Sequence, residues 1–231
     1  MQSSKKLILA IDTSSSPLLL AAGNGEKIFS VRKSGVKQER LLFPSLEKLL
    51  QKADAQMQDI GKIFLIRGPG RFTGIRISLT FASMLQYLNE TEVYGATMFE
   101  VLHEQAKSSS FYADWKKKNP SGSIAVVLHA FREEYFLQFF DEDNQPPVWL
   151  SKEELLNKLA AYSRSVYVTG FDKDRTSLDL LLGGKYYLAP FKDCLPQPQT
   201  LLHMAMQARY KQNALEPLYL KPARFELVTP V

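Results

Sequence analysis

The same order of strands and helices is predicted twice along this chain of 231 residues, and this repetition constrains the fold more than any other feature. In each half, three short apolar segments separated by turn residues predict a meander, and helical and strand-like segments then alternate. The predicted elements of the first half lie at 7–11, 17–22, 27–32, 39–53, 63–66, 77–88, near 93 and at 97–107. Those of the second half lie at 124–128, 135–140, 148–150, from 151 onward, and at 166–169, 178–182, 186–188 and 200–212.

Both halves have the order strand, strand, strand, helix, strand, helix, strand, helix, although their residues show negligible identity. Two such halves packed together describe the fold shared by actin, sugar kinases and Hsp70. We therefore predict an α/β protein with a duplicated actin-like (ASKHA, ribonuclease H-like) fold of two βββαβαβα lobes. The first lobe is expected at 1–107, a polar connector at 108–122, and the second lobe, with a C-terminal helix and tail, at 123–231.

Two of the predicted helices begin with a capping box, in which a hydroxyl residue and a glutamate three positions later satisfy each other's backbone N–H groups. Thr97 with Glu100 and Ser151 with Glu154 match this pattern. A third helix follows a glycine-rich loop, and Thr73 is its expected N-cap.

The composition excludes some classes of protein. The formal charge of +5 permits contact with nucleic acid without requiring it. A single cysteine, Cys194, forms no intrachain disulfide, and no segment approaches the roughly 20 apolar residues of a membrane span. The apolar run at 7–11 is too short for a signal peptide, so we expect a cytoplasmic protein without membrane contact.

Two loops of the first half are candidates for binding an anion or a nucleotide. Asp12 and Thr13 lie at the first hairpin, where actin-like ATPases hold phosphate or magnesium, but a turn that satisfies its own backbone explains them as well. The loop GPGRFTG at 68–74, with Gly68, Gly70, Arg71 and Thr73, presents backbone N–H groups or permits a tight strand-to-helix connection. It is neither a Walker A loop nor a GxGxxG fingerprint.

The second half lacks a matching acidic loop. An actin-like kinase needs a second aspartate where the second meander begins, and His129 stands there instead. The three histidines form no metal-binding pattern, and Cys194 has no histidine nearby in the sequence. We therefore expect no catalytic residue, no metal site and no cofactor of the chain's own.

The first two predicted helices carry more apolar residues than one face of a small sheet needs, and such a surplus often marks a partner interface. With Arg76, the predicted interface residues are Leu42, Phe43, Leu46, Leu49, Phe72, Phe81 and Met84.

Four segments in order, ILAIDTSSSP at 8–17, RLLFPSLEKLL at 40–50, GPGRFTGIRIS at 68–78 and EPLYLKPA at 216–223, resemble the TsaB (YeaZ) family. The resemblance implies a non-catalytic subunit that pairs with a TsaD-like catalytic subunit through its first-lobe helices. With a TsaE-like ATPase, that complex transfers threonylcarbamoyl to N6 of adenosine 37 in tRNAs that read ANN codons. It also implies self-association without TsaD, ATP and metal on the partner subunits, and tRNA contact that is indirect or weak.

The sequence departs from the family pattern at 37–40, where a histidine is usual, and at 129–131, where HisAlaPhe replaces AspAlaArg. There are two alternative interpretations. The first is a small actin-like ATP-dependent phosphotransferase, suggested by Asp12 and the glycine-rich loop and weakened by the missing second carboxylate. The second is a glycoprotease-like peptidase, an activity suggested by relatives of this fold and not by the residues, since the sequence offers neither a metal motif nor a nucleophile.

Overall fold

The structure is a computed structural model that describes residues 7–24, 26–35, 38–141, 145–171 and 175–221. Gly25 of the first predicted hairpin turn, Lys37 of the departing segment and the tail beyond 221 lie outside these residues. The chain forms two compact units, one of Met1–Val101 with Pro196–Leu218 and the other of Leu102–Leu195 with Tyr219–Val231. We describe each unit by itself.

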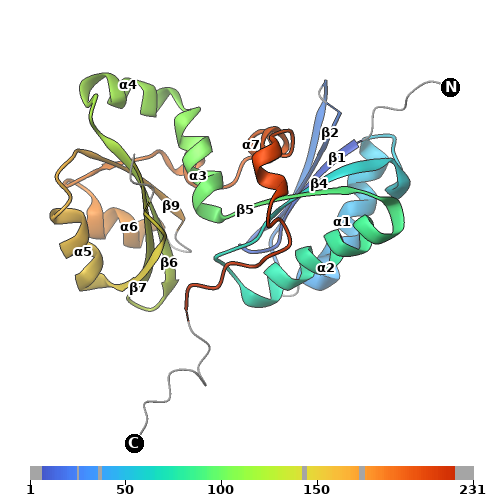
Figure 1. Ribbon diagram of the computed structural model, residues 1–231, viewed down its shortest axis with the longest axis horizontal. Coiled ribbons are helices and arrows are strands. Elements are labelled where there is room, and N and C mark those ends of the chain that lie inside the picture. The colour runs from blue at the N-terminus through green and yellow to red at the C-terminus, as the bar shows by residue number, and fades with distance from the viewer. Residues whose placement is uncertain (1–6, 25, 36–37, 142–144, 172–174, 222–231) are drawn as a thin grey trace, which may run out of the picture. The chain divides into compact units, whose positions relative to one another are not determined.

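The first unit is built on a five-stranded sheet in the order β3-β2-β1-β4-β5 (Figure 1). The meander β1–β2–β3 is antiparallel, and β4 and β5 run parallel to β1. Its strands are β1 (Leu7–Asp12), β2 (Leu18–Gly23), β3 (Ile28–Lys33), β4 (Ile60–Ile66) and β5 (Glu92–Ala96). The helical segments are α1 (Gln38–Lys52), η1 (Met57–Asp59), α2 (Phe72–Asn89), α7 (Pro198–Met204) and η3 (Ala208–Lys211). Helix α3 (Met98–Lys107) begins in this unit and continues from Leu102 as part of the second.

Helices cover both faces of this sheet. Leu9 and Ile11 of β1 join a buried cluster with Leu42 of α1 and Phe81 of α2, so α1 and α2 pack on one face. Helix α7 contacts β1, β2 and β4, and Figure 1 shows it on the other side of the sheet. Because both faces are covered, every residue of β2 is buried.

The second unit repeats the topology with the sheet order β10-β9-β6-β7-β8. Read from β8 to β10, this order matches β3 to β5, which confirms the predicted duplication of the fold. Its strands are β6 (Ser123–Phe131), β7 (Glu134–Phe140), β8 (Val148–Ser151), β9 (Val166–Phe171) and β10 (Tyr187–Leu188). The helical segments are α4 (Ser110–Lys118), α5 (Lys152–Ala160), α6 (Arg175–Leu182) and η2 (Phe191–Cys194).

Both capping boxes are present. The Thr97 hydroxyl accepts from the Glu100 N–H at 3.1 Å, and the Glu100 carboxylate accepts from the Thr97 N–H at 2.7 Å. Ser151 and Glu154 make the same reciprocal bonds at the start of α5. Thr73, by contrast, lies inside α2, because the backbone is already helical from Phe72 and Arg71 is the N-cap.

Two of the expected segment boundaries differ from the structure. The predicted connector at 108–122 contains α4, whose Trp115 is buried against the Tyr167 ring at 5.4 Å between centroids. The C-terminal helix packs with the first unit and not with the second, because Leu201 and Met204 are buried and α7 lies on β1, β2 and β4. That helix ends at Met204, and a separate 3₁₀ turn follows.

Within the described part of the chain, each helix is too short or too polar to cross a membrane.

Candidate functional site

Asp12, at the end of β1, is buried inside the hairpin turn that follows it. One carboxylate oxygen accepts from the Ser14 N–H at 2.8 Å, the Ser14 hydroxyl at 2.7 Å and the Ser15 N–H at 3.3 Å. The other accepts from the Ser15 hydroxyl at 2.5 Å. Four donors from the two following residues therefore surround this carboxylate, which is the arrangement of a turn that satisfies its own polar groups.

The glycine-rich loop packs directly on this turn. The Thr13 hydroxyl donates to the Gly74 carbonyl at 2.6 Å, and the Arg71 N–H donates to the Ser14 carbonyl at 2.7 Å. A Cβ on Gly70 would meet that same Ser14 oxygen at 2.5 Å, so a side chain there cannot be accommodated without movement of the backbone.

The other side of the loop packs against the segment at 216–218. The Leu218 N–H donates to the Arg67 carbonyl at 2.8 Å, and the Arg67 guanidinium donates to the Glu216 carbonyl at 3.1 Å. Gly68 has φ +121°, and a Cβ on it would meet the Leu218 carbonyl oxygen at 2.5 Å. The glycines thus allow three backbone segments to approach one another closely, and this supports the architectural interpretation of the loop.

The structure brings together all six residues predicted as anion or nucleotide contacts, since the turn of Asp12 and Thr13 lies on the loop of Gly68, Gly70, Arg71 and Thr73. Arg71 and Thr73 are exposed there. The loop N–H of Arg71 is already bonded to protein, as are the donors around Asp12. Anion binding at this place stays a prediction.

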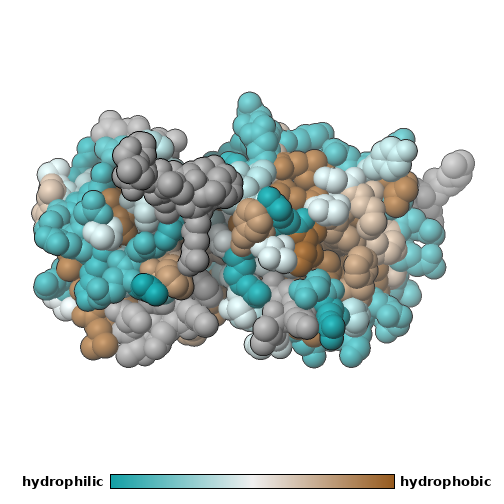
Figure 2. Space-filling view, turned by 90° about the horizontal axis from the view of Figure 1, so that it is seen from below, coloured by the Kyte–Doolittle hydropathy of each residue, from teal (hydrophilic) through white to brown (hydrophobic). Residues whose placement is uncertain are grey.

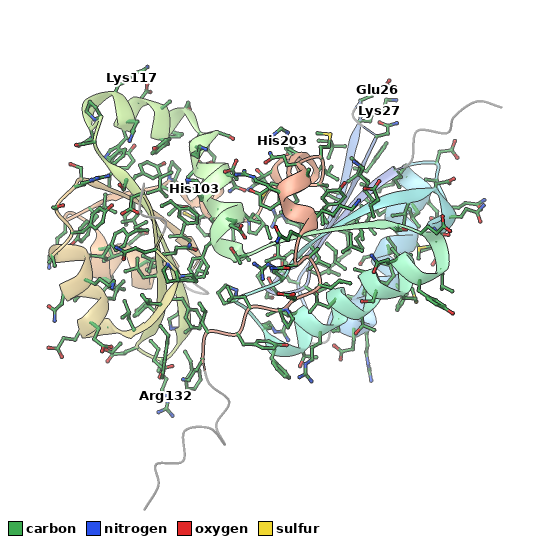
Figure 3. The ribbon with its side chains drawn as sticks, in the orientation of Figure 1. Glu26, Lys27, His103, Lys117, Arg132 and His203 are labelled. Atoms are coloured by element: carbon green, nitrogen blue, oxygen red, sulfur yellow. The ribbon has the colours of Figure 1, made fainter. Side chains whose placement is uncertain are left out.

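The equivalent position of the second unit is His129. In the parallel strand pairs, Ile11 lies opposite Leu65 and Leu128 lies opposite Phe171, so Asp12 and His129 follow matching positions of their sheets. The Nε2 atom of His129 lies 2.6 Å from the Arg132 carbonyl, within the tip of the β6–β7 hairpin. Figure 3 shows Arg132 at this tip. The second unit therefore has an imidazole engaged with its own hairpin where an actin-like kinase needs a carboxylate.

The other two histidines lie on different helices. His103 lies on α3 and His203 on α7 (Figure 3). The His103 ring stacks on Phe140 with 4.0 Å between centroids, which agrees with packing rather than catalysis. Among the described residues, no three of His, Cys, Asp and Glu are grouped closely enough to hold a metal ion.

The most distinctive surface of the first unit is an apolar face on α1 and α2. Figure 2 shows brown residues gathered over the part of the molecule where Figure 1 places these helices. Tyr87 is 87% exposed, Leu88 68% and Phe43 57%, and Phe72 and Met84 are also exposed. We call these five residues the α1/α2 apolar face.

This result corrects half of the predicted partner interface. Phe43, Phe72, Arg76 and Met84 are exposed, as an interface requires. For four apolar residues the prediction is wrong, because they point inward from the same helices and form the core with the sheet; they are Leu42, Leu46, Leu49 and Phe81. Counting apolar residues along a helix did not separate the inward row from the outward row.

Tyr87 and Leu88 are the exposed residues that the predicted interface omits. Tyr87 lies three positions after Met84 on α2, a spacing that places the two side chains on neighbouring parts of one helix face. This spacing in the sequence could have identified Tyr87 as a further residue of the predicted interface.

A hollow lies beside the C-terminal end of α2, with Glu90, Glu92 and Lys211 in its lining. Lys211 Nζ lies 3.0 Å from a Glu92 carboxylate oxygen, and Tyr94 donates to the same carboxylate at 2.9 Å. The hydrogen bond from Lys211, with a smaller contribution from Tyr94, lowers the pKa of Glu92.

Comparison with known proteins gives one consistent set of relatives. A model of the TsaD family, described as tRNA N6-adenosine threonylcarbamoyltransferase, matches residues 36–137. The tRNA threonylcarbamoyladenosine biosynthesis protein TsaB of Bacillus subtilis is 24% identical over 95% of this chain and 96% of its own length. The protein of the same name from Buchnera aphidicola of Schizaphis graminum is 30% identical, and this match covers 54% of the chain and 55% of that relative, about half of each.

Two solved structures from Pseudomonas aeruginosa show the same fold. One, described as an uncharacterized protein with similarity to the peptidase YeaZ, has a TM-score of 0.67 at 19% identity and covers 94% of this chain and 100% of its own. The other, YeaZ itself, has a TM-score of 0.65 at 19% identity and covers 93% and 100%. Both extend over the two duplicated units described above.

Proposed function

This chain belongs to the TsaB (YeaZ) family, and on that premise we propose that it is the non-catalytic subunit that pairs with a TsaD-type catalytic protein. With a TsaE-type ATPase, the complex transfers threonylcarbamoyl to N6 of adenosine 37 in tRNAs that read ANN codons. The TsaB relatives are named as tRNA threonylcarbamoyladenosine biosynthesis proteins, which supports this reaction as the setting.

The α1/α2 apolar face is the main observation in support of pairing with a catalytic protein. Tyr87 and Leu88 are large and mostly exposed on α2, and Phe43 is exposed on α1, where its ring meets Phe81 of α2 edge-on with 5.9 Å between centroids. Contiguous exposed apolar surface of this kind marks a protein interface in soluble proteins. A partner that covers these side chains removes them from water, which stabilises the complex by roughly 25 cal/mol for each Å² of apolar area buried.

The two hairpins support the part of the proposal that assigns no catalysis to this chain alone. The Asp12 carboxylate already accepts four hydrogen bonds from its own turn, and His129 occupies the matching position of the second unit. Phosphoryl transfer in an actin-like enzyme needs acidic groups from both lobes to hold the metal and orient the nucleophile. ATP and metal are therefore assigned to the partner subunits, and contact with tRNA is indirect or weak. The phosphotransferase alternative gains no support from these contacts.

The proposal also includes self-association through the α1/α2 apolar face when the catalytic partner is absent, and a cytoplasmic location.

Reconstitution tests the proposed function. The chain is mixed with the TsaD-type and TsaE-type proteins of the same organism, and threonylcarbamoyl transfer to tRNA is measured with and without it. We expect a stable complex with the TsaD-type protein, transfer that depends on the chain, and no ATP turnover by the chain alone. Failure to associate, together with ATP turnover by the isolated chain, would contradict the proposal.

A further inference from the structure

One arginine lies within the apolar face of α2. The guanidinium carbon of Arg76 stands 3.8 Å from the centre of the Phe72 ring, one helical turn away, and both side chains are exposed. Arg76 is the only charged residue of α2, whose 18 residues include no Asp or Glu. A single cation therefore lies over an aromatic ring within the exposed surface of α2.

The shape of this surface fits another helical face. Thr80 and Ser83 are small and exposed, and with Phe72, Arg76, Met84 and Tyr87 they recur at three- and four-residue spacing along one side of α2. From Phe72 to Tyr87 this row is about 22 Å long. Small residues at the centre and large ones at the ends allow a second helix to pack closely along it.

Covering Arg76 with apolar groups alone would be unfavourable, since a buried cation without a partner loses its hydration without compensation. A carboxylate on the partner removes this cost, because the stacked guanidinium presents its N–H edge for two parallel hydrogen bonds. The first unit as a whole is basic: it holds 15 Lys or Arg and 10 Asp or Glu, so the chain's charge of +5 falls entirely on it. An acidic counterpart is favoured for this reason as well.

A second copy of this chain is poorly suited to place a carboxylate beside Arg76. If two copies paired α2 against α2, each would set Arg76 against a helix without an acidic residue, and the exposed carboxylates nearest this face, Glu39 and Glu47, would come from α1. A different protein, with a carboxylate on an apolar helical face, satisfies both the shape and the charge.

We propose that the partner presents a carboxylate to the Arg76–Phe72 stack, and that this pair selects a different protein over a second copy of the chain. The proposal rests on the proposed function and specifies the chemistry of the partner's surface.

The test measures the dissociation constant of the full chain with the TsaD-type protein of the same organism, for wild type, Arg76→Glu, Arg76→Lys and Arg209→Glu. Arg209 is the matched control, an arginine of the same unit that lies on η3 and whose guanidinium carbon is 4.6 Å from the Tyr210 ring centre. We expect Arg76→Glu to weaken binding about 100-fold or more, Arg76→Lys about 10-fold, and Arg209→Glu less than about twofold. Thermal unfolding confirms that each variant is folded.

A charge exchange identifies the carboxylate. Each Asp or Glu on the docking face of the TsaD-type protein is changed to Lys and measured against Arg76→Glu, and one such combination should recover most of the lost affinity. Equal binding by Arg76→Glu and Arg209→Glu would overturn the inference and leave the proposed function standing. Failure of the wild-type chain to bind at all would overturn both.

Sedimentation of the chain alone tests the choice of partner. We expect Arg76→Glu to leave self-association unchanged or to strengthen it, since α2 of a second copy offers no acidic residue to Arg76. Loss of self-association in this variant, as large as its loss of binding to the TsaD-type protein, would overturn the proposal in favour of a second copy.

Discussion

The two units share one topology but present different helical surfaces. In the first unit, α2 has 18 residues, one charged side chain and an exposed apolar row. In the second unit, α5 has nine residues, and its buried Leu155 and Leu159 face inward while the outer side carries Lys152, Glu153 and Lys158. Helix α5 needs only its own sheet, whereas α2 has apolar residues on both sides. Helix α6, which takes the place of α2 in the order of the second unit, exposes Leu180.

The net charge also distinguishes the two units. The second unit contains 14 basic and 14 acidic residues, so the excess of positive charge belongs to the first unit. Duplication of a fold therefore need not duplicate its surface: here the first unit carries the excess positive charge and the exposed apolar row of α2.

The largest effect is expected from Leu46→Asp, which tests whether the inner row of α1 belongs to the core. Leu46 is buried, so the aspartate loses its hydration and the packing of Leu46 is lost as well. We expect the free energy of unfolding to fall by about 4 kcal/mol or more. Phe43→Asp on the outer row should change it by less than about 1 kcal/mol while weakening partner binding. Chemical denaturation measures both; similar losses in the two variants would remove the distinction between the rows.

A smaller effect is expected from Gly68→Ala, which compares the packed loop of the first unit with an open turn of the second. The new Cβ would meet the Leu218 carbonyl at 2.5 Å at a φ of +121°, so we expect a loss of about 3 kcal/mol. Gly184 also has a positive φ, +76°, but nothing lies within 4 Å of its Cβ position. Gly184→Ala should therefore cost about 1 kcal/mol. Equal losses of stability in the two variants would show that the positive φ, and not close packing, is the reason for a glycine at position 68.

Tyr87→Ala should weaken binding of the TsaD-type protein by about 2 kcal/mol, the size expected of an aromatic interface anchor. Leu180 is its counterpart in the second unit, an apolar side chain on α6 that is 82% exposed. Leu180→Ala should leave the affinity unchanged when measured by calorimetry. An affinity loss for Leu180 and none for Tyr87 would move the interface to the second unit.

The smallest effects are expected at the two capping boxes, which occur once in each unit. Thr97→Ala and Ser151→Ala each remove a hydroxyl that accepts a backbone N–H at the start of a helix, and each should cost about 1 kcal/mol. Because Thr97 is buried and Ser151 is exposed, we expect the larger loss at Thr97. Thermal unfolding of the two variants checks the order, and a larger loss at Ser151 would contradict it.

Much of the fold follows from local sequence signals. Both capping boxes, the two meanders and the alternation of helices and strands depend on residues within a few positions of one another, and the structure contains all of them. The packing of α7 on the first sheet does not follow from such signals. It depends on contacts between distant segments, such as the hydrogen bond from the Arg32 guanidinium to the Pro196 carbonyl, and no local pattern encodes these.

The candidate site shows the same division. The short polar side chains after Asp12 were enough to suggest a turn that satisfies its own backbone, and the structure contains its hydrogen bonds. The sequence left open whether the glycines bind an anion or permit close packing, because the residues around a glycine do not reveal which backbone segment approaches it. Gly70 touches Ser14 and Gly68 touches Leu218, and the second of these neighbours lies far along the chain.

Hydroxyl-radical footprinting of the chain, alone and with the TsaD-type protein, tests the docking of the first unit most directly, since it reports the solvent exposure of individual side chains. Phe72, Met84 and Tyr87 should react readily in the free chain and become protected in the complex. Phe131 and Leu180 of the second unit, exposed to a comparable extent, should react equally in both states. Unchanged reactivity along α2, with protection of Phe131 or Leu180 instead, would contradict the assignment of the docking surface.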